Sequence, residues 1–169
     1  QLATLDNVTL LEGNHEANLR DYGLPDGVAS KEFRMHTAPE LAQAGLSRKA
    51  VYNFYRKLSQ CFCYTYQGKK VLVSHGGLAR MPENLSWWQQ RSWFTAPACM
   101  RMRWSDICFA KHAAADEYQV HGYRNYEGVP AEVNEHCFNL DGAVEMGGQL
   151  RELELSEDGF VTKMIASSK

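Results

Sequence analysis

The sequence lacks any apolar run of the roughly 18 residues that a membrane-spanning helix needs, and no charged-then-apolar leader pattern opens the chain. It also lacks an excess of charge of one sign, because 18 Lys and Arg residues face 20 Asp and Glu residues, for a formal net charge of −2. No polycationic surface for nucleic acid follows from this balance, so a polyanionic substrate must be bound by local charge or by metal. These absences predict a soluble, cytoplasmic protein.

The sequence also lacks a C-x-x-C pair, and its five cysteines are odd in number, with Cys61 and Cys63 closest together. This usage predicts reduced thiols and argues against a disulfide framework. A chain of 169 residues with 44% hydrophobic content is long enough for one globular domain, which we predict over residues 1–169. Because Leu2 and Leu5 have the spacing of the end of a helix, we expect the chain to begin inside a longer protein.

The apolar pattern predicts an α/β fold. A short buried strand is expected at residues 8–11, followed by a loop with Gly and Pro turns through residue 30. Helical spacing over residues 47–60 predicts a helix with Ser47 as its N-cap. Strict alternation predicts a hairpin over residues 61–74 that turns at Gln67 and Gly68. A further strand is expected near residues 118–121, and closing strands joined by glycine turns after residue 136.

Histidines next to glycine stand at the ends of three of these β-rich segments. They are His15, His75 and His121. In layered α/β folds, loops at strand ends converge, and glycine allows the backbone to approach a ligand closely. Imidazole is a common metal ligand and a proton donor near neutral pH, so this pattern predicts metal or acid–base chemistry. The other histidines, at 36, 112 and 136, lack this context and are expected to be ordinary surface or core residues.

Two of the histidine segments match a known pair of motifs. Residues 13–16, Gly-Asn-His-Glu, and residues 75–77, His-Gly-Gly, resemble the third and fourth motifs of the calcineurin-like metallophosphoesterases. The branch that is most similar holds serine/threonine protein phosphatases, diadenosine tetraphosphatases and polynucleotide phosphatases. Residues 138–150 resemble the strand-turn-strand that follows the last metal motif of that group, and residues 103–106, Arg-Trp-Ser-Asp, resemble a stretch of the protein phosphatases. The resemblance implies part of a β-sandwich flanked by helices, without the N-terminal strands that carry the first two motifs.

The resemblance also implies a function and a set of site residues. It assigns Asn14 and His75 to one metal of a two-metal centre, and it makes His15 the catalytic residue that protonates the leaving-group oxygen. Two divalent ions would then clamp the phosphate and activate a water. Manganese is the first expectation, with iron, zinc and nickel as alternatives. The expected reaction is the hydrolysis of a phosphate monoester.

The chain departs from the family pattern at two places. The first two family motifs, Gly-Asp-x-His-Gly and Gly-Asp-x-x-Asp-Arg-Gly, are missing, since neither Gly-Asp nor Asp-Arg occurs in the sequence. We therefore expect an N-terminally incomplete domain that holds metal weakly and has little activity by itself. The second departure is Gly122-Tyr123 in place of the Gly-His of the last metal motif. Tyr123 takes the ligand position on strict alignment, but His121 projects from the same strand face and is the alternative metal ligand.

The substrate is suggested by one further region. Tryptophans and basic residues alternate there in a mixture that stacks bases and neutralises phosphates in single-strand binders. These residues are Trp87, Trp88, Arg91, Trp93, Arg101, Arg103, Trp104 and Lys111. The alternative is that the tryptophans cover the core. A nucleotide or single-stranded polynucleotide phosphate is the first expected substrate and a phosphoprotein the second. A catalytically inactive scaffold that binds a partner, such as the missing N-terminal segment or a fused domain, is the alternative of another class. No membrane partner is expected.

Overall fold

A computed structural model describes residues 4–83, 102–123, 125 and 130–165 of the chain. The chain divides into two compact units, Gln1–Gln60 and Cys61–Lys169, and each is described by itself. In the described ranges, none of the helices is long and apolar enough to cross a membrane. The combination of helices and a mixed sheet confirms the predicted α/β class.

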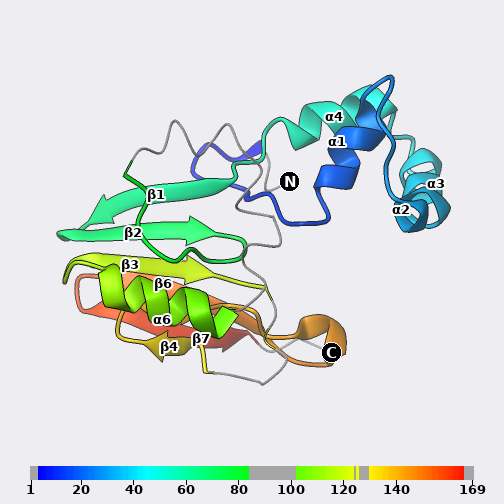
Figure 1. Cartoon of the computed structure of the whole chain (residues 1–169). Helices are drawn as coiled ribbons and strands as arrows, with labels where there is room; N and C mark the ends of the chain where they lie inside the picture. Colours follow the sequence, from blue (N-terminus) through cyan, green and yellow to red (C-terminus); the bar gives the residue numbers. More distant parts are fainter. Residues whose placement is uncertain (1–3, 84–101, 124, 126–129, 166–169) are drawn as a thin grey trace. The chain divides into compact units, whose positions relative to one another are not determined.

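The first unit is helical (Figure 1). It contains α1 (Ala17–Gly23), α2 (Lys31–Met35), α3 (Thr37–Gln43) and α4 (Arg48–Tyr55). Helices α1 and α4 pack closely at Gly23, where an added Cβ would lie 2.5 Å from the Cβ of Tyr52. From residue 4 onward, the buried apolar residues of this unit are Ala29, Phe33 and Val51.

Predictions for this unit were partly wrong. The predicted helix with Ser47 as N-cap is confirmed, since Ser47 Oγ accepts a hydrogen bond from the Ala50 N–H at 3.2 Å. Residues 8–11 do not form the predicted strand, because their pairing is limited to one parallel bridge between Leu11 and Ser59. The polar stretch predicted as a loop contains α1, whose residues are all at least partly exposed. Apolar periodicity therefore gave no helical signal there.

The second unit is built on a five-stranded sheet with the order β1-β2-β3-β5-β4. Its strands are β1 (Cys61–Tyr66), β2 (Lys69–Ser74), β3 (Glu117–His121), β4 (Glu132–Asn134) and β5 (Cys137–Asn139). The predicted hairpin is confirmed: β1 and β2 are antiparallel, and Gln67 and Gly68 form the turn with φ values of 49° and 74°. Strands β2, β3 and β5 run parallel to one another, so their carboxyl ends lie at the same edge of the sheet.

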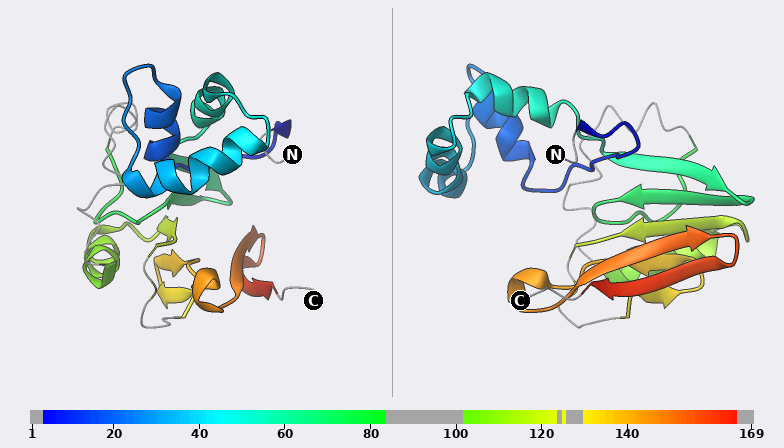
Figure 2. Two further views of the ribbon diagram at one scale, coloured as in Figure 1. Left: turned by 90° about the vertical axis from the view of Figure 1, so that its right-hand side faces the viewer. Right: turned by 180° about the vertical axis from the view of Figure 1, so that it is seen from behind.

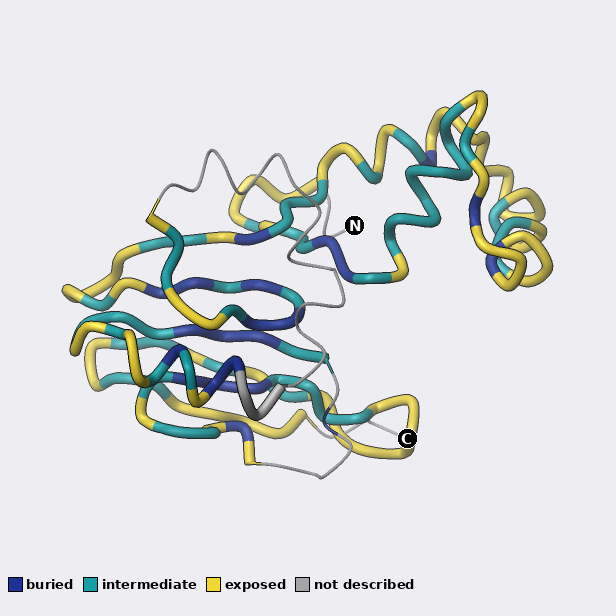
Figure 3. The backbone as a smooth tube through the Cα atoms, in the orientation of Figure 1, coloured by how far each residue is buried: buried dark blue, intermediate teal, exposed yellow. Residues whose placement is uncertain are grey.

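Both faces of this sheet are covered (Figures 1 and 2). Helix α6 (Met102–His112) packs on one face, where Phe109 joins a buried cluster with Leu72 and Cys137. The hairpin of β6 (Leu150–Ser156) and β7 (Gly159–Ile165) lies on the other face, with Phe160 against Val120 and Phe138. A short 3-10 helix, η4 (Val144–Met146), precedes β6. Figure 3 shows the buried backbone running through the central strands of the sheet.

Helix α6 was missed by the sequence analysis. Among its described side chains, residues 105–112, the buried positions are Ser105, Asp106 and Phe109. They follow helical spacing, but two of the three are polar. A search for apolar periodicity finds no clear stripe in such a helix. One of the two buried polar residues, Asp106, contacts side chains of β3.

Candidate functional site

The loop that carries Asn14 and His15 belongs to the first unit and is held by polar contacts. The carboxylate of Glu12 is 3% exposed and accepts a hydrogen bond from the Tyr55 hydroxyl at 3.0 Å. The Gly13 N–H donates to Glu16 Oε2 at 2.8 Å, and the Glu12 N–H donates to the Ser59 carbonyl at 2.8 Å. These bonds fix the backbone on both sides of Asn14, which is partly buried.

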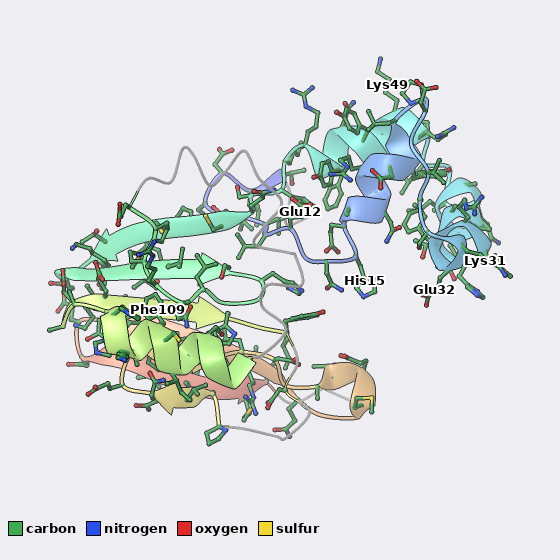
Figure 4. The ribbon with its side chains drawn as sticks, viewed as in Figure 1. Glu12, His15, Lys31, Glu32, Lys49 and Phe109 are labelled. Carbon is green, nitrogen blue, oxygen red and sulfur yellow. The ribbon has the colours of Figure 1, made fainter. Side chains whose placement is uncertain are left out.

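His15 is exposed at the start of α1 (Figure 4), and its carbonyl accepts hydrogen bonds from the backbone and side chain of Asn18. It lies at a cavity of about 260 Å³ within the same unit. The lining residues come from α1, α2 and the start of α3. They are His15, Glu16, Asn18, Leu19, Ser30, Glu32, Phe33, His36 and Thr37. A group bound in this cavity would therefore be next to the His15 imidazole.

His75 follows β2 in the second unit, in a turn whose backbone is tightly determined. The Gly77 N–H donates to the Ser74 hydroxyl at 3.2 Å, and Gly77 itself has φ +72°. Because β2 and β3 are parallel and Ser74 pairs with His121, the two strand ends are neighbours. The Gly122 N–H donates to the His75 carbonyl at 2.9 Å. The structure thus brings together the two predicted histidine segments of this unit.

The ring of Tyr123 contacts the ring of His75. The two rings have centroids 4.9 Å apart and are tilted by 44°. Tyr123 has φ +68°, a conformation that is uncommon for a residue other than glycine and is often found at functional sites. The residue that takes the ligand position on strict alignment is therefore in contact with His75.

His121, the alternative metal ligand, has a different environment. Its side chain is 0% exposed, with Nε2 2.8 Å from Asp106 Oδ1 and Nδ1 2.9 Å from the Gly122 carbonyl oxygen. Gln119 lies next to it and donates to the same Asp106 oxygen at 3.0 Å. Both ring nitrogens of His121 are thus hydrogen-bonded within the protein. These two hydrogen bonds explain why Asp106, a polar residue of α6, is buried.

Sequence reasoning missed a second carboxylate near these strand ends. Asp141 follows β5, and its oxygens accept hydrogen bonds from the backbone N–H groups of Asn125 and Ala143. The Leu140 N–H donates to the His121 carbonyl, which ties the end of β5 to the end of β3. The signal was present as an Asn-Leu-Asp-Gly segment at the end of a predicted strand. Its aspartate was not considered because it lacks a neighbouring histidine.

The described residues do not form a complete metal site. Within ranges 4–83, 102–123, 125 and 130–165, no group of three His, Cys, Asp or Glu side chains is placed to hold a metal ion. The predicted ligands Asn14, His75 and His121 are all neutral, whereas divalent ions in proteins usually have carboxylate or thiolate ligands. The donor set therefore does not fit a resident two-metal centre without further ligands.

The described cysteines add nothing to the site. Burial raises the pKa of Cys63 to about 11 and that of Cys137 to about 12, which disfavours thiolate chemistry.

Most of the predicted nucleic-acid surface lies outside the described residues, namely Trp87, Trp88, Arg91, Trp93 and Arg101. Residues 103 and 104 lie on α6 without described side chains, and Lys111 is exposed on the same helix. The predicted nucleic-acid surface thus stays a prediction.

The chain was also compared with known proteins. No family model, no curated protein and no solved structure matches it. The resemblance to the metallophosphoesterases therefore depends on the motifs alone.

Proposed function

We propose that this chain carries part of the active site of a metal-dependent phosphatase that hydrolyses phosphate monoesters. The observation that carries the proposal is the turn after β2, which presents His75 beside Tyr123 at the carboxyl ends of parallel strands. Ligand sites of α/β proteins are commonly found at such strand ends. In the proposal His75 is a ligand of a divalent ion, manganese first, and the rest of the centre depends on further carboxylate ligands. Asn14, in the other unit, stays a ligand proposed from the motif alone.

His15 is the proposed general acid. It is exposed at the edge of the 260 Å³ cavity, so a departing alcohol has room next to the imidazole. Proton donation to the leaving-group oxygen converts a strongly basic alkoxide into a neutral alcohol. The pairing of an exposed histidine with a fixed neighbouring backbone suits this role, because the ring can reach the substrate while the loop does not move away.

The substrate is proposed on sequence grounds. A nucleotide or a single-stranded polynucleotide phosphate is preferred over a phosphoprotein, because bases stack on tryptophans and phosphates bind arginines. Binding of short single-stranded oligonucleotides is the measurement that separates them. Oligonucleotide affinity should fall steeply between low and physiological salt, whereas a phosphopeptide with a single phosphate should show a much weaker dependence.

The enzyme proposal is tested by hydrolysis of p-nitrophenyl phosphate with excess manganese. The assay uses this chain and, where the coding sequence extends upstream of Gln1, the longer polypeptide as well. We expect little turnover from this chain, because its candidate ligands are neutral, and robust turnover from a polypeptide that adds Gly-Asp motifs. Robust turnover by this chain alone would contradict the ligand assignment. No turnover by either protein, with no metal bound, would favour the inactive scaffold.

A further inference from the structure

The imidazole of His121 is enclosed by groups from β3, α6 and the turn after β2. Asp106 of α6 contacts one ring nitrogen, and the Gly122 carbonyl contacts the other. Gly77 of the turn lies directly against the ring, since a Cβ at Gly77 would be 3.2 Å from both Cγ and Cδ2 of His121. The turn after His75 therefore packs directly against the His121 ring.

The directions of the hydrogen bonds around the His121 ring follow from two backbone groups, the Leu78 N–H, which donates, and the Gly122 carbonyl, which accepts. The Leu78 backbone N–H donates to Gln119 Oε1 at 2.9 Å, which fixes the orientation of the amide. Gln119 Nε2 then donates to Asp106 Oδ1 at 3.0 Å. A carbonyl oxygen only accepts, so His121 Nδ1 must carry a hydrogen. Nε2 is bonded to the Asp106 carboxyl group, so both ring nitrogens are already engaged by hydrogen bonds within the protein.

We infer that His121 and Asp106 are positioning residues for the turn that presents His75, and that His121 is not a metal ligand. The part that concerns metal depends on the proposed function, whereas the positioning of the turn does not. Tyr123, whose ring contacts His75, is then the side chain from the end of β3 that faces the candidate site.

The positioning acts through two adjacent contacts. A displaced His121 ring would release Gly77, and a displaced Gln119 would release the N–H of Leu78. Gly77 and Leu78 directly follow His75 and Gly76 in the chain. The Gly122 N–H holds the His75 carbonyl from the same strand end. A change at Asp106 should therefore reach His75 through these contacts, as outer hydrogen-bond partners orient the ligands of metal sites.

The first test uses the full chain without metal and follows the histidine rings by ¹⁵N NMR. Asp106→Asn replaces the carboxyl group that the His121 ring contacts, and we expect the ring signals of both His121 and His75 to shift. The matched control is Asp116→Asn, which changes an exposed carboxylate paired with Lys70 just before β3. His136 is an internal reference, since its ring is bonded to the Glu117 carbonyl at the other end of β3. If His75 moves no more in Asp106→Asn than in Asp116→Asn, the inference is overturned.

A second pair of variants covers the case in which Asp106→Asn does not fold. Gly77→Ala and Gly68→Ala introduce the same methyl group at φ +72° and +74°, so the backbone penalty is similar. Only the first methyl group meets His121, because nothing lies within 4 Å of a Cβ at Gly68. We expect Gly77→Ala to shift the His121 ring signals and Gly68→Ala to leave them in place. Equal spectra for the two variants would contradict the contact.

The third measurement adds zinc to the wild-type chain and follows the same ring signals. We expect the His75 signals to change while those of His121 keep their positions. Movement of both sets by direct coordination would overturn the inference. If neither histidine responds, the proposed metal site fails, and the positioning role is decided by the metal-free variants alone. The two proposals can thus fail separately.

Discussion

The two units hold their candidate site residues by different means. In the helical unit, the loop around Asn14 and His15 is fixed by hydrogen bonds from Tyr55, Glu16 and Ser59, and little apolar surface is buried near it. In the sheet unit, the turn after His75 rests on a buried polar network above a core cluster around Phe109. The comparison shows that hydrogen bonds fix the backbone around the exposed His15, whereas buried side chains support the turn that carries His75.

The largest expected effect concerns the two candidate functional histidines. In a preparation with measurable turnover, His15→Asn should lower the hydrolysis of an alkyl phosphate by about 10²–10⁴, the usual contribution of a positioned general acid. A p-nitrophenyl ester should be much less affected, because its leaving group departs without a proton. His75→Asn should impair both esters and lower metal content.

The two histidine variants are separated by metal analysis and by the ratio of rates on the two esters. Loss of metal in His15→Asn would contradict its role as an acid. An equal loss of rate on both esters would do the same. Either result would also remove the proposed difference between His15 as an acid and His75 as a metal ligand.

The next effect compares the cores of the two units. Phe109 is 0% exposed and Phe33 is 8% exposed. Phe109→Ala should lower the free energy of unfolding by about 3–5 kcal/mol, because it opens a cavity in a closed cluster. Phe33→Ala should cost less than about 3 kcal/mol, since its surroundings contain fewer buried residues. Urea denaturation measures the free energy of unfolding of each variant, and hydrogen exchange shows which unit is destabilised. Equal losses for the two variants would contradict the prediction that the core of the sheet unit contributes more.

A smaller effect is expected for the hydroxyl group that holds the Glu12 carboxylate. Tyr55→Phe removes the donor of a buried carboxylate and should cost about 1–3 kcal/mol. The neighbouring Tyr52→Phe is the matched control, as its ring stacks at 6.4 Å from that of Tyr55. Thermal or urea unfolding measures both, and equal costs would mean that the Glu12 bond does not stabilise the loop.

The same tyrosine predicts a dependence on pH. Burial, and then the Glu12 carboxylate, raises the pKa of Tyr55. A raised pKa favours the neutral phenol in the folded state, so its contribution to stability is complete below about pH 10, the usual phenol value. It is lost as the pH rises through the folded-state pKa. Wild type should therefore lose stability in alkaline solution faster than Tyr55→Phe, and parallel curves would contradict this prediction.

The smallest effect is expected at the cap of α4. Ser47→Ala removes the hydrogen bond to the Ala50 N–H and should cost about 1 kcal/mol in the helical unit. Ser47→Gly should lower the free energy of unfolding by only roughly a few tenths of a kcal/mol. Hydrogen exchange in β1–β3 should not change in either variant. A loss of protection in the sheet would show that the two units do not unfold separately.

Local patterns explain which elements could be predicted. The hairpin of β1 and β2 follows from strict alternation and a Gln-Gly turn, and α4 follows from helical spacing after Ser47. Helices α1 and α6 were missed because α1 has no buried residue and because two of the three buried positions among residues 105–112 of α6 are polar. An element whose inner face is polar gives no apolar period, whatever its stability in the fold.

By itself the sequence identified His15, His75 and His121 through their nearby glycines, and the resemblance of its motifs added Asn14 and Tyr123 as candidates. It left the choice between His121 and Tyr123 open, since both were predicted on one face of one strand. That prediction was wrong, because β3 ends at His121 and Tyr123 lies beyond it with φ +68°. Only the tertiary structure placed Asp106 of α6 against the His121 ring and the Tyr123 ring against that of His75. The physical reason is that a strand's neighbours on its two faces come from distant parts of the chain. Burial and hydrogen bonding are decided by those neighbours and not by the spacing of residues along the strand.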